Sequence, residues 1–374
     1  MVYVIAFSIT FLLMAIIQVK YLKIPVPEKN KKTFGRIHLE KYSLRRTALF
    51  FISSLPLFFI SALRYGIGTD YFYGYVPCFN VVKAGRFDLT SLEKGYVFLN
   101  YIVSLFTSDY QWIFVVTSGI FVFLCFKTIE RKSRFPLLAL IIFYLSFAYL
   151  DSYNTIRQSI ACAIILISSP LILTDKKRDK LVFLLFLVLA MQFHRASIVY
   201  GVMLLLVSYN FEWPIFAISI AVVYGFRYTV IERLKEFLGS YIRYEYYFSQ
   251  QSVGRGTSNY VILANILILV MLIYIEFRND NISQNKEWRY IKWMQYNVIM
   301  LLPFDGIIGF AGRAEMLFMF PQFITIPNAI LMHNYPKERR WMTALVIVLY
   351  LVEFIFFYTT NRCEVFPYVS IFQK

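Results

Sequence analysis

Residues 47–75 read TALFFISSLPLFFISALRYGIGTDYFYGY. The first part, Thr47–Leu63, is an apolar run long enough to cross a bilayer as a helix. The second part, Arg64–Tyr75, holds an arginine, an aspartate, three glycines and four tyrosines. Glycine permits tight backbone paths, arginine binds phosphate, a carboxylate acts as a general base or metal ligand, and tyrosine offers a flat face with a hydroxyl. This mixture after an apolar run suits a site for a sugar or a lipid phosphate.

The composition of the whole chain is that of a polytopic membrane protein. Of 374 residues, 59% are hydrophobic, above the roughly 45–50% of soluble domains. The 38 Lys and Arg exceed the 22 Asp and Glu, for a formal charge of +16. In a membrane protein this excess indicates cytoplasmic loops and anionic lipid, not nucleic acid. Four cysteines lack the spacing of a zinc site or a disulfide framework, and the three histidines are too scattered for a metal cluster.

The distribution of the cations sets the expected orientation. The first apolar run, Val4–Gln18, has no basic leader or cleavage signal and is interpreted as a retained helix. Nine cations follow it in the loop through Arg46, so this loop is predicted to be cytoplasmic and the N-terminus to lie outside. Alternation then predicts about twelve spans, with the C-terminus outside and 24 of the 38 cations on inner loops. The expected spans are Val4–Gln18, Thr47–Leu63, Tyr110–Phe126, Phe135–Leu150, Ser159–Leu173, Leu181–Phe193, Ser197–Ser208, Trp213–Thr229, Tyr260–Phe277, Trp293–Phe304, Met316–His333 and Trp341–Tyr358.

One further apolar segment, Glu93–Phe106, is predicted to be a re-entrant or surface helix on the outer side. If it spanned the membrane, the basic loop Lys127–Arg134 would fall outside, against the positive-inside bias. A helix lying in the interface is expected over Ile231–Ser258. The chain shows no internal repeat and no linker, so we expect one all-α integral membrane domain over residues 1–374, with outer loops 64–109 and 230–259 forming the site face.

Four polar motifs lie at the expected outer ends of separate spans, and each contains an arginine. Convergence on an anion is the simplest explanation, since a cation at the membrane boundary is costly without a partner. Plainer roles stay open: Arg64 could snorkel to headgroups, His194 could be a satisfied histidine at a helix end, and Arg313 could pair locally with Glu315. The motifs are Arg64–Tyr75, Asp151–Gln158, Gln192–Ser197 and Asp305–Glu315.

The ordered set of motifs resembles the EpsG family, which comprises Wzy-like polymerases of bacterial exopolysaccharide and capsule. The resemblance covers essentially the whole chain. One departure is Arg195-Ala196 after His194, where small or hydroxyl residues are usual. The motifs are Arg64-x-Gly66-x-Gly68-Thr69-Asp70-Tyr71 with Tyr73 or Tyr75, Glu93-x-Gly95-Tyr96, Asn154-x-x-Arg157-Gln158-x-x-Ala161, Phe193-His194-x-x-Ser197, Gly312-Arg313 and Phe366-Pro367-Tyr368-x-x-Ile371-Phe372.

The resemblance implies a GT-C-like glycosyltransferase that joins undecaprenyl-diphosphate-linked oligosaccharide repeats at the outer leaflet of the bacterial cytoplasmic membrane. It implies no cofactor, with Mg²⁺ left open, and no nucleic acid. Membrane lipids and a chain-length regulator or flippase are the further partners to expect. The expected catalytic residues are Asp70 as base, Glu93 as sugar ligand or alternate base, and His194; the diphosphate ligands are Arg64, Arg157, Arg195 and Arg313; and the sugar ligands are Tyr71, Tyr73, Asn154 and Gln158.

Two other functions fit part of the pattern. A lipid-linked glycan flippase or exporter would use a cationic lining, but it predicts charges distributed along the spans, whereas the polar motifs here gather at one face. A GT-C enzyme that transfers a single sugar from a polyprenyl phosphate differs from a polymerase only in the size and phosphate count of its substrate.

Overall fold

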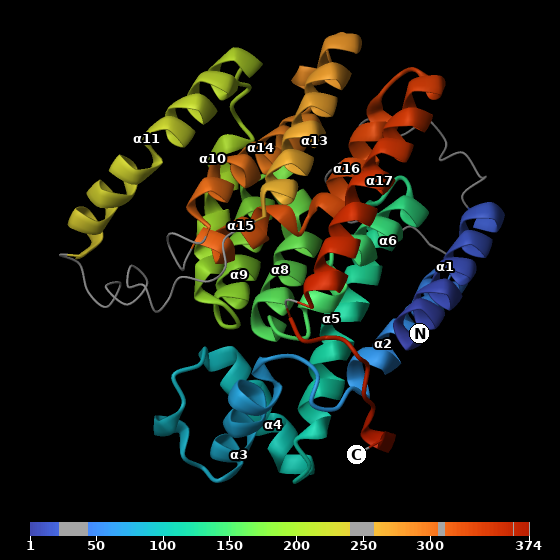
Figure 1. Ribbon diagram of the computed structural model, residues 1–374, viewed down its shortest axis with the longest axis vertical. Helices are drawn as coiled ribbons and strands as arrows, with labels where there is room; N and C mark the ends of the chain where they lie inside the picture. Colours follow the sequence, from blue (N-terminus) through green and yellow to red (C-terminus); the bar gives the residue numbers. More distant parts are fainter. Residues whose placement is uncertain (22–43, 240–257, 306–310, 362, 374) are drawn as a thin grey trace. The chain divides into compact units, whose positions relative to one another are not determined.

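The computed structural model describes residues 1–21, 44–239, 258–305, 311–361 and 363–373 (Figure 1). Within these ranges every regular element is a helix, and the one strand-like pairing is an isolated bridge between Arg64 and Ser370. The expected all-α fold class is therefore confirmed for the described residues. Most of the first cationic loop, and residues 240–257 of the expected interface helix, lie outside them.

The described helices form two compact units. The first contains residues 1–195 and 350–374, and the second contains residues 196–349. The expectation of a single integral membrane domain stays a prediction.

The first unit is built on apolar helices, some of which pack on the next helix of the sequence and others on more distant ones. α1 packs on α2 and on α6, α2 packs on α5, and α5 and α9 both pack on α8. The contacts between these helices are largely apolar, because most of the buried side chains are apolar, with Ser and Thr among them. The helices are α1 (Val2–Tyr21), α2 (Leu44–Ala62), α5 (Gln111–Lys132), α6 (Pro136–Leu145), α8 (Ile156–Ser168) and α9 (Lys177–Met191).

Between α2 and α5 the chain forms a set of short helices, and this segment carries five of the eleven predicted site residues. It contains a π-helix η2 (Tyr71–Tyr75), then α3 (Val76–Lys83), the 3₁₀ turn η3 (Phe87–Leu89) and α4 (Lys94–Phe106). α3 and α4 pack against each other (Figure 1). α4 has the bounds predicted for the re-entrant or surface helix, with Glu93 as its N-cap.

The C-terminal tail fixes the glycine-rich segment that precedes η2. The backbone N–H of Tyr65 donates to Val369 O at 2.9 Å, and that of Gly68 donates to Glu364 O at 3.2 Å. The N–H of Ile371 donates in turn to Leu63 O at 2.9 Å. Two motifs at opposite ends of the sequence are therefore one structural element.

Several expected spans are broken. The run Phe135–Leu150 divides into α6 and the short α7 (Ala148–Asp151), because Phe147 has a left-handed φ of 64° that no α-helix accommodates. α8 ends at Ser168 and continues as the 3₁₀ turn η4 (Ser169–Leu173), which contains Pro170. The run Ser197–Ser208 forms the 3₁₀ helix η5 (Arg195–Val202) and α10 (Met203–Leu206).

These breaks bear on the span count. Among the described residues, five helical segments are long and apolar enough to cross a membrane, and a sixth results if the bent pair α15 (Ala311–Met319) and α16 (Gln322–Met332) is one span with a 42° bend. The chain is thus a membrane protein by the length and composition of its helices, but the expected number of twelve spans is not confirmed. The five are Val2–Val19, Gln111–Lys132, Ile156–Leu173, Asn259–Arg278 and Pro336–Thr360.

The largely apolar interior of the second unit contains a cluster of buried amides. Gln322 Nε2 donates to Asn265 Oδ1 at 2.7 Å and to Gln295 Oε1 at 2.8 Å, and all three side chains are buried. The amides satisfy one another, which offsets the cost of removing them from water. The helices are α11 (Trp213–Gly239), α13 (Asn259–Arg278), α14 (Lys286–Leu301), α15, α16 and the first part of α17 (Pro336–Thr360).

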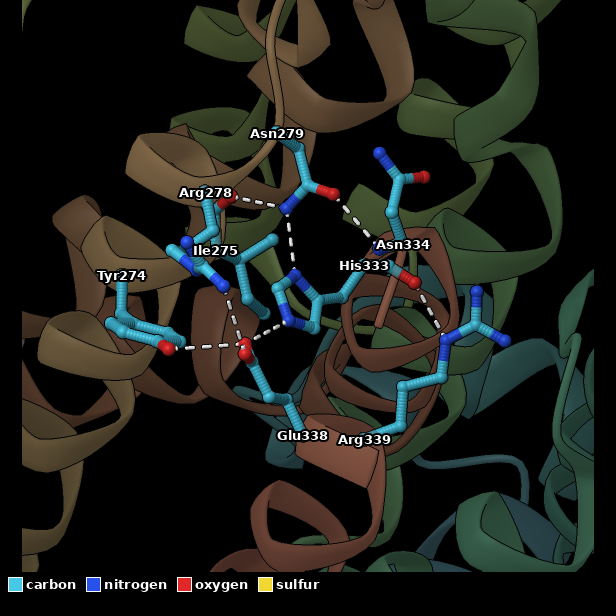
Figure 2. Close-up of polar contacts among 8 residues, drawn as sticks. All are labelled: Tyr274, Ile275, Arg278, Asn279, His333, Asn334, Glu338 and Arg339. Carbon is cyan, nitrogen blue, oxygen red and sulfur yellow. Dashed lines mark hydrogen bonds and ion pairs between the residues drawn. The ribbon is translucent and has the colours of Figure 1, made fainter. Parts of the chain in front are cut away.

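A second polar cluster joins α13, α16 and α17, and Figure 2 shows it. His333 is fully buried, with Asn279 Nδ2 2.7 Å from its Nδ1 and Glu338 Oε2 2.6 Å from its Nε2. Glu338 also accepts from Tyr274 Oη at 3.0 Å and from Arg278 Nη2 at 3.1 Å. Because Asn279 Oδ1 accepts from the backbone N–H of Asn334, its amide nitrogen is the group that faces His333. His333 therefore carries its proton on Nε2 and donates it to Glu338.

Candidate active site

The first unit brings together three residues predicted to act in the site: Glu93, Arg157 and His194. Arg157 Nη1 donates to Glu93 Oε2, and His194 Nδ1 lies 3.6 Å from Glu93 Oε1. The exposed fractions of the three side chains are 11% for Glu93, 25% for Arg157 and 9% for His194. We call these three residues the Glu93 cluster. The cluster is mostly shielded from water, and Arg157 is its most exposed side chain.

The backbone explains why these separate motifs meet. The N–H of Gly95, in the first turn of α4, donates to the carbonyl of Gln192 at the end of α9 at 2.8 Å. A Cβ at Gly95 would lie 2.7 Å from Gln192 O, so only glycine permits this approach. Glu93 is thereby held beside His194, and Arg157 joins them from the first turn of α8, which packs on α9.

Tyr75 lies beside the Glu93 cluster, against the start of α8. Its hydroxyl donates to the carbonyl of Asn154 at 2.5 Å and accepts from the N–H of Ile156 at 3.1 Å. Burial raises the pKa of the Tyr75 phenol well above its usual value, although Arg157 opposes the shift. The phenol therefore stays protonated and acts as a hydrogen-bond donor, not as a base.

Asn154 organises the glycine-rich segment. Its side-chain oxygen lies 3.3 Å from Thr69 Oγ1 and 3.5 Å from the backbone N of Asp70, and its amide nitrogen donates to Cys363 O at 2.7 Å. Gly68 has a φ of 98°, and a Cβ there would meet Asn154 Oδ1 at 2.5 Å. The expected sugar ligand is thus already engaged with protein groups, while the Asp70 carboxylate is exposed on this segment.

The predicted phosphate ligand Arg64 lies in the interior of the unit and is 1% exposed. Its Nη1 donates to Ser61 O at 2.7 Å and lies 3.4 Å from Ser118 Oγ. Its guanidinium carbon is 4.9 Å from the ring centroid of Phe114 and 4.5 Å from that of Tyr153. These contacts give Arg64 a structural role in joining α2, α5 and the segment before α8.

The comparisons with known proteins bear on these motifs. The model of the EpsG family matches residues 47–370. The chain belongs to the EpsG family. The match begins with α2 and reaches the C-terminal tail, so it contains the Glu93 cluster and the tail that fixes the glycine-rich segment. No curated protein and no solved structure matches the chain. Membership of the EpsG family assigns the protein to polysaccharide biosynthesis in membranes.

The other expected sugar ligands of this EpsG-family chain differ in exposure. Tyr71 is fully buried, donates from its hydroxyl to Gln111 Oε1 at 2.8 Å and stacks on Phe114 at 4.2 Å between ring centroids. Gln158 is buried as well, whereas Tyr73 is 91% exposed. Of the tyrosines predicted to bind sugar, only Tyr73 presents its ring at the surface.

The two remaining arginines lie in different places. Arg195 is exposed and belongs to the first unit, directly after His194. Arg313 is exposed and belongs to the second unit, in the first turn of α15. A Cβ at the neighbouring Gly312 would lie 2.5 Å from Asp305 Oδ1, so the glycine lets the Asp305 carboxylate approach the start of this helix.

The structure adds two residues to which the sequence assigned no role. Tyr75 stood in the tyrosine-rich stretch without an assigned role, and Lys94 directly follows Glu93. The signal for Lys94 was its position between Glu93 and Gly95 in one short motif. Within the described part of the chain, no group of three or more His, Cys, Asp or Glu side chains is arranged to hold a metal ion.

Proposed function

We propose that the protein is a polysaccharide polymerase that joins lipid-diphosphate-linked oligosaccharide repeats at the outer leaflet of the cytoplasmic membrane. Membership of the EpsG family supports a role in polysaccharide biosynthesis. The observation that carries the chemistry is the Glu93 cluster, in which a carboxylate, an imidazole and a guanidinium from three separate motifs meet. Glycosyl transfer from a diphosphate needs a base and a cationic contact for the leaving group.

In the proposed reaction the acceptor hydroxyl of one repeat attacks the anomeric carbon of the other. The bond from this carbon to the diphosphate oxygen breaks, and the diphosphate leaves with the bonding electrons. Direct displacement of this kind inverts the configuration at the anomeric carbon. His194 Nε2 takes the hydroxyl proton, while Glu93, 3.6 Å from the other ring nitrogen, orients the imidazole and stabilises its charged form.

Arg157 is the proposed contact for the leaving diphosphate. Only Nη1 of its guanidinium contacts Glu93, and its Nε has no hydrogen-bond partner among the described residues. A guanidinium presents five N–H donors, so it can contact Glu93 and a phosphate together. Asp70, which the sequence predicts to be the base, is exposed on the glycine-rich segment. In this proposal it contacts the sugar, and His194 takes the proton in its place.

Two conservative substitutions test this function in membranes that contain the lipid-linked repeat. Glu93→Gln keeps the size of the side chain but removes its charge, and we expect it to abolish polymer and to leave single-repeat lipid unconsumed. Asp70→Asn is expected to slow polymer formation with a smaller effect. The lipid-linked material is separated by chain length on a gel.

The outcomes separate the candidate functions. Full polymer from a correctly folded Glu93→Gln protein would overturn the proposed mechanism. Consumption of a polyprenyl-phosphate monosaccharide, with the repeats left unjoined, would instead identify a single-sugar glycosyltransferase. Repeats that the wild-type protein moves across the membrane without joining them would identify a transporter.

A further inference from the structure

A groove of about 450 Å³ lies beside α4 in the first unit. Its apolar walls include Phe98, which is 62% exposed, and Phe87, which is 45% exposed. The ring of Phe87 packs against the edge of Tyr101 at 5.7 Å between centroids, which joins the η3 turn to α4. The lining residues are Phe87, Thr90, Ser91, Leu92, Lys94, Val97, Phe98, Tyr101 and Arg195.

The charges of the groove have one sign. Lys94 and Arg195 are its two charged lining residues, and no carboxylate lines it. Neither cation has an ion-pair or hydrogen-bond partner among the residues that the structure describes. Both side chains are exposed. The groove therefore combines aromatic walls with two cations that are available to an anion.

The position of the groove follows from the backbone contact that builds the Glu93 cluster. The hydrogen bond from Gly95 to Gln192 holds the segments of residues 93–95 and 192–195 together. Glu93 and His194 take part in the cluster, while their direct neighbours in sequence, Lys94 and Arg195, line the groove. One backbone contact thus places a cationic, apolar groove next to the proposed catalytic residues.

We propose that this groove binds the diphosphate and the first isoprenoid units of a lipid-linked substrate, with Lys94 and Arg195 as phosphate contacts in addition to Arg157 of the adjoining Glu93 cluster. The assignment rests on the proposed function and names the part of the substrate that this surface holds. The volume lies in the range of about 300–1,000 Å³ typical of small-molecule sites, which suits a diphosphate with a short length of tail. Charge-assisted contacts bind the head, and the exposed aromatic rings pack against the first isoprenoid units of the tail.

Direct binding to the full-length protein in detergent tests this assignment without any turnover. The probes are geranylgeranyl diphosphate, inorganic diphosphate and geranylgeraniol, each titrated and followed by microscale thermophoresis. We expect saturable binding of geranylgeranyl diphosphate that is at least about tenfold tighter than binding of either partial probe, since each lacks the head or the tail.

Variants of the lining residues locate the bound probe. The double variant Lys94→Gln/Arg195→Gln is expected to weaken binding of geranylgeranyl diphosphate by about tenfold or more, and Phe98→Ser by a smaller factor. The matched controls are Lys83→Gln, an exposed cation in the last turn of α3, and Phe106→Ser, an 85% exposed ring at the far end of α4. Neither control lines the groove, and both should bind as the wild-type protein does.

Three results would overturn the proposal. These are wild-type affinity in the double variant, equal affinity for inorganic diphosphate together with no effect of Phe98→Ser, or equal affinity for geranylgeraniol. The readout is separate from that of the proposed function. If the wild-type protein makes polymer but the groove variants bind geranylgeranyl diphosphate as tightly as it does, only the proposal that the groove binds lipid diphosphate is refuted. If the groove variants bind the probe more weakly but the wild-type protein never joins repeats, only the proposed polymerase activity is refuted.

Discussion

Arg157 is the residue whose chemistry is least replaceable in the Glu93 cluster. Its guanidinium contacts a carboxylate on one side, and its Nε has no hydrogen-bond partner in the described part of the protein. A lysine would keep the charge but present a single point of contact. The identity of this side chain, and not only its charge, should therefore matter.

We expect Arg157→Lys to reduce polymer formation by roughly tenfold or more, because one charge-assisted hydrogen bond contributes about 1.5–3 kcal/mol. The rate of conversion of single-repeat lipid into polymer measures the effect. The control is Arg131→Lys, an exposed arginine in the last turn of α5, which should polymerise at the wild-type rate. Equal rates for both variants would show that a point charge at position 157 suffices.

Gly68 is constrained twice, by its backbone conformation and by its neighbour. Its φ of 98° is unfavourable for any residue with a Cβ, and the Cβ of alanine would also meet Asn154 Oδ1 at 2.5 Å. Gly85 shares the positive φ, at 72°, but a Cβ there meets no atom within 4 Å. Substituting alanine at each of the two glycines therefore distinguishes the cost of backbone strain from the cost of a steric clash.

Gly85→Ala is expected to destabilise the protein by about 1–3 kcal/mol, which is the cost of the backbone conformation alone. Gly68→Ala should cost more, because Asn154 must also shift and loosen its bond to Cys363. Thermal unfolding of the purified protein in detergent measures both. If Gly68→Ala lowered the free energy of unfolding by less than Gly85→Ala, the predicted clash between a Cβ at position 68 and Asn154 would be contradicted.

At the scale of the elements, the polar cluster around His333 ties three helices of the second unit together. Glu338 near the start of α17 accepts hydrogen bonds from α13 and from His333 at the end of α16 (Figure 2). Because His333 is fully buried, removing its acceptor leaves an unsatisfied N–H away from water. The cluster should therefore contribute more to stability than an exposed ion pair.

Glu338→Ala is expected to lower the free energy of unfolding by more than the loss of a surface ion pair does, because it leaves the buried His333 without its acceptor. The control is Glu236→Ala on α11, whose ion pair with Arg233 is exposed and should contribute at most about 1 kcal/mol. Thermal unfolding in detergent compares them. Losses of equal size would mean that the buried cluster contributes no more than a surface pair.

The expected helices were most accurate where an apolar run had a clear end. α1, α2, α4 and α13 begin and end within a few residues of the expected spans and the expected surface helix. The run Phe135–Leu150 was wrong as one helix, because nothing in its apolar composition signals the left-handed turn at Phe147. Short breaks of this kind depend on packing between helices, which a window of hydropathy does not contain.

At the scale of the whole molecule, the match to the EpsG family confirms the resemblance that the ordered motifs indicated. Single motifs carried little information, since any one boundary arginine has several explanations. The order of the motifs along the chain was specific for the EpsG family, and the family model matches residues 47–370, which contain nearly all of them. Twelve spans remain unconfirmed, since the described helices supply five or six segments of sufficient length.

The sequence by itself determined the membrane class, the all-α fold and the family, because these depend on composition, apolar periodicity and the order of short motifs. Only the tertiary structure decided which side chains of the motif Arg64–Tyr75 are accessible: Arg64 and Tyr71 are buried, and Asp70 and Tyr73 are exposed. It also decided that Glu93 meets Arg157 and His194. The physical reason is that these contacts join residues far apart in sequence, and the close approach of Gly95 to Gln192 that permits them has no local signature.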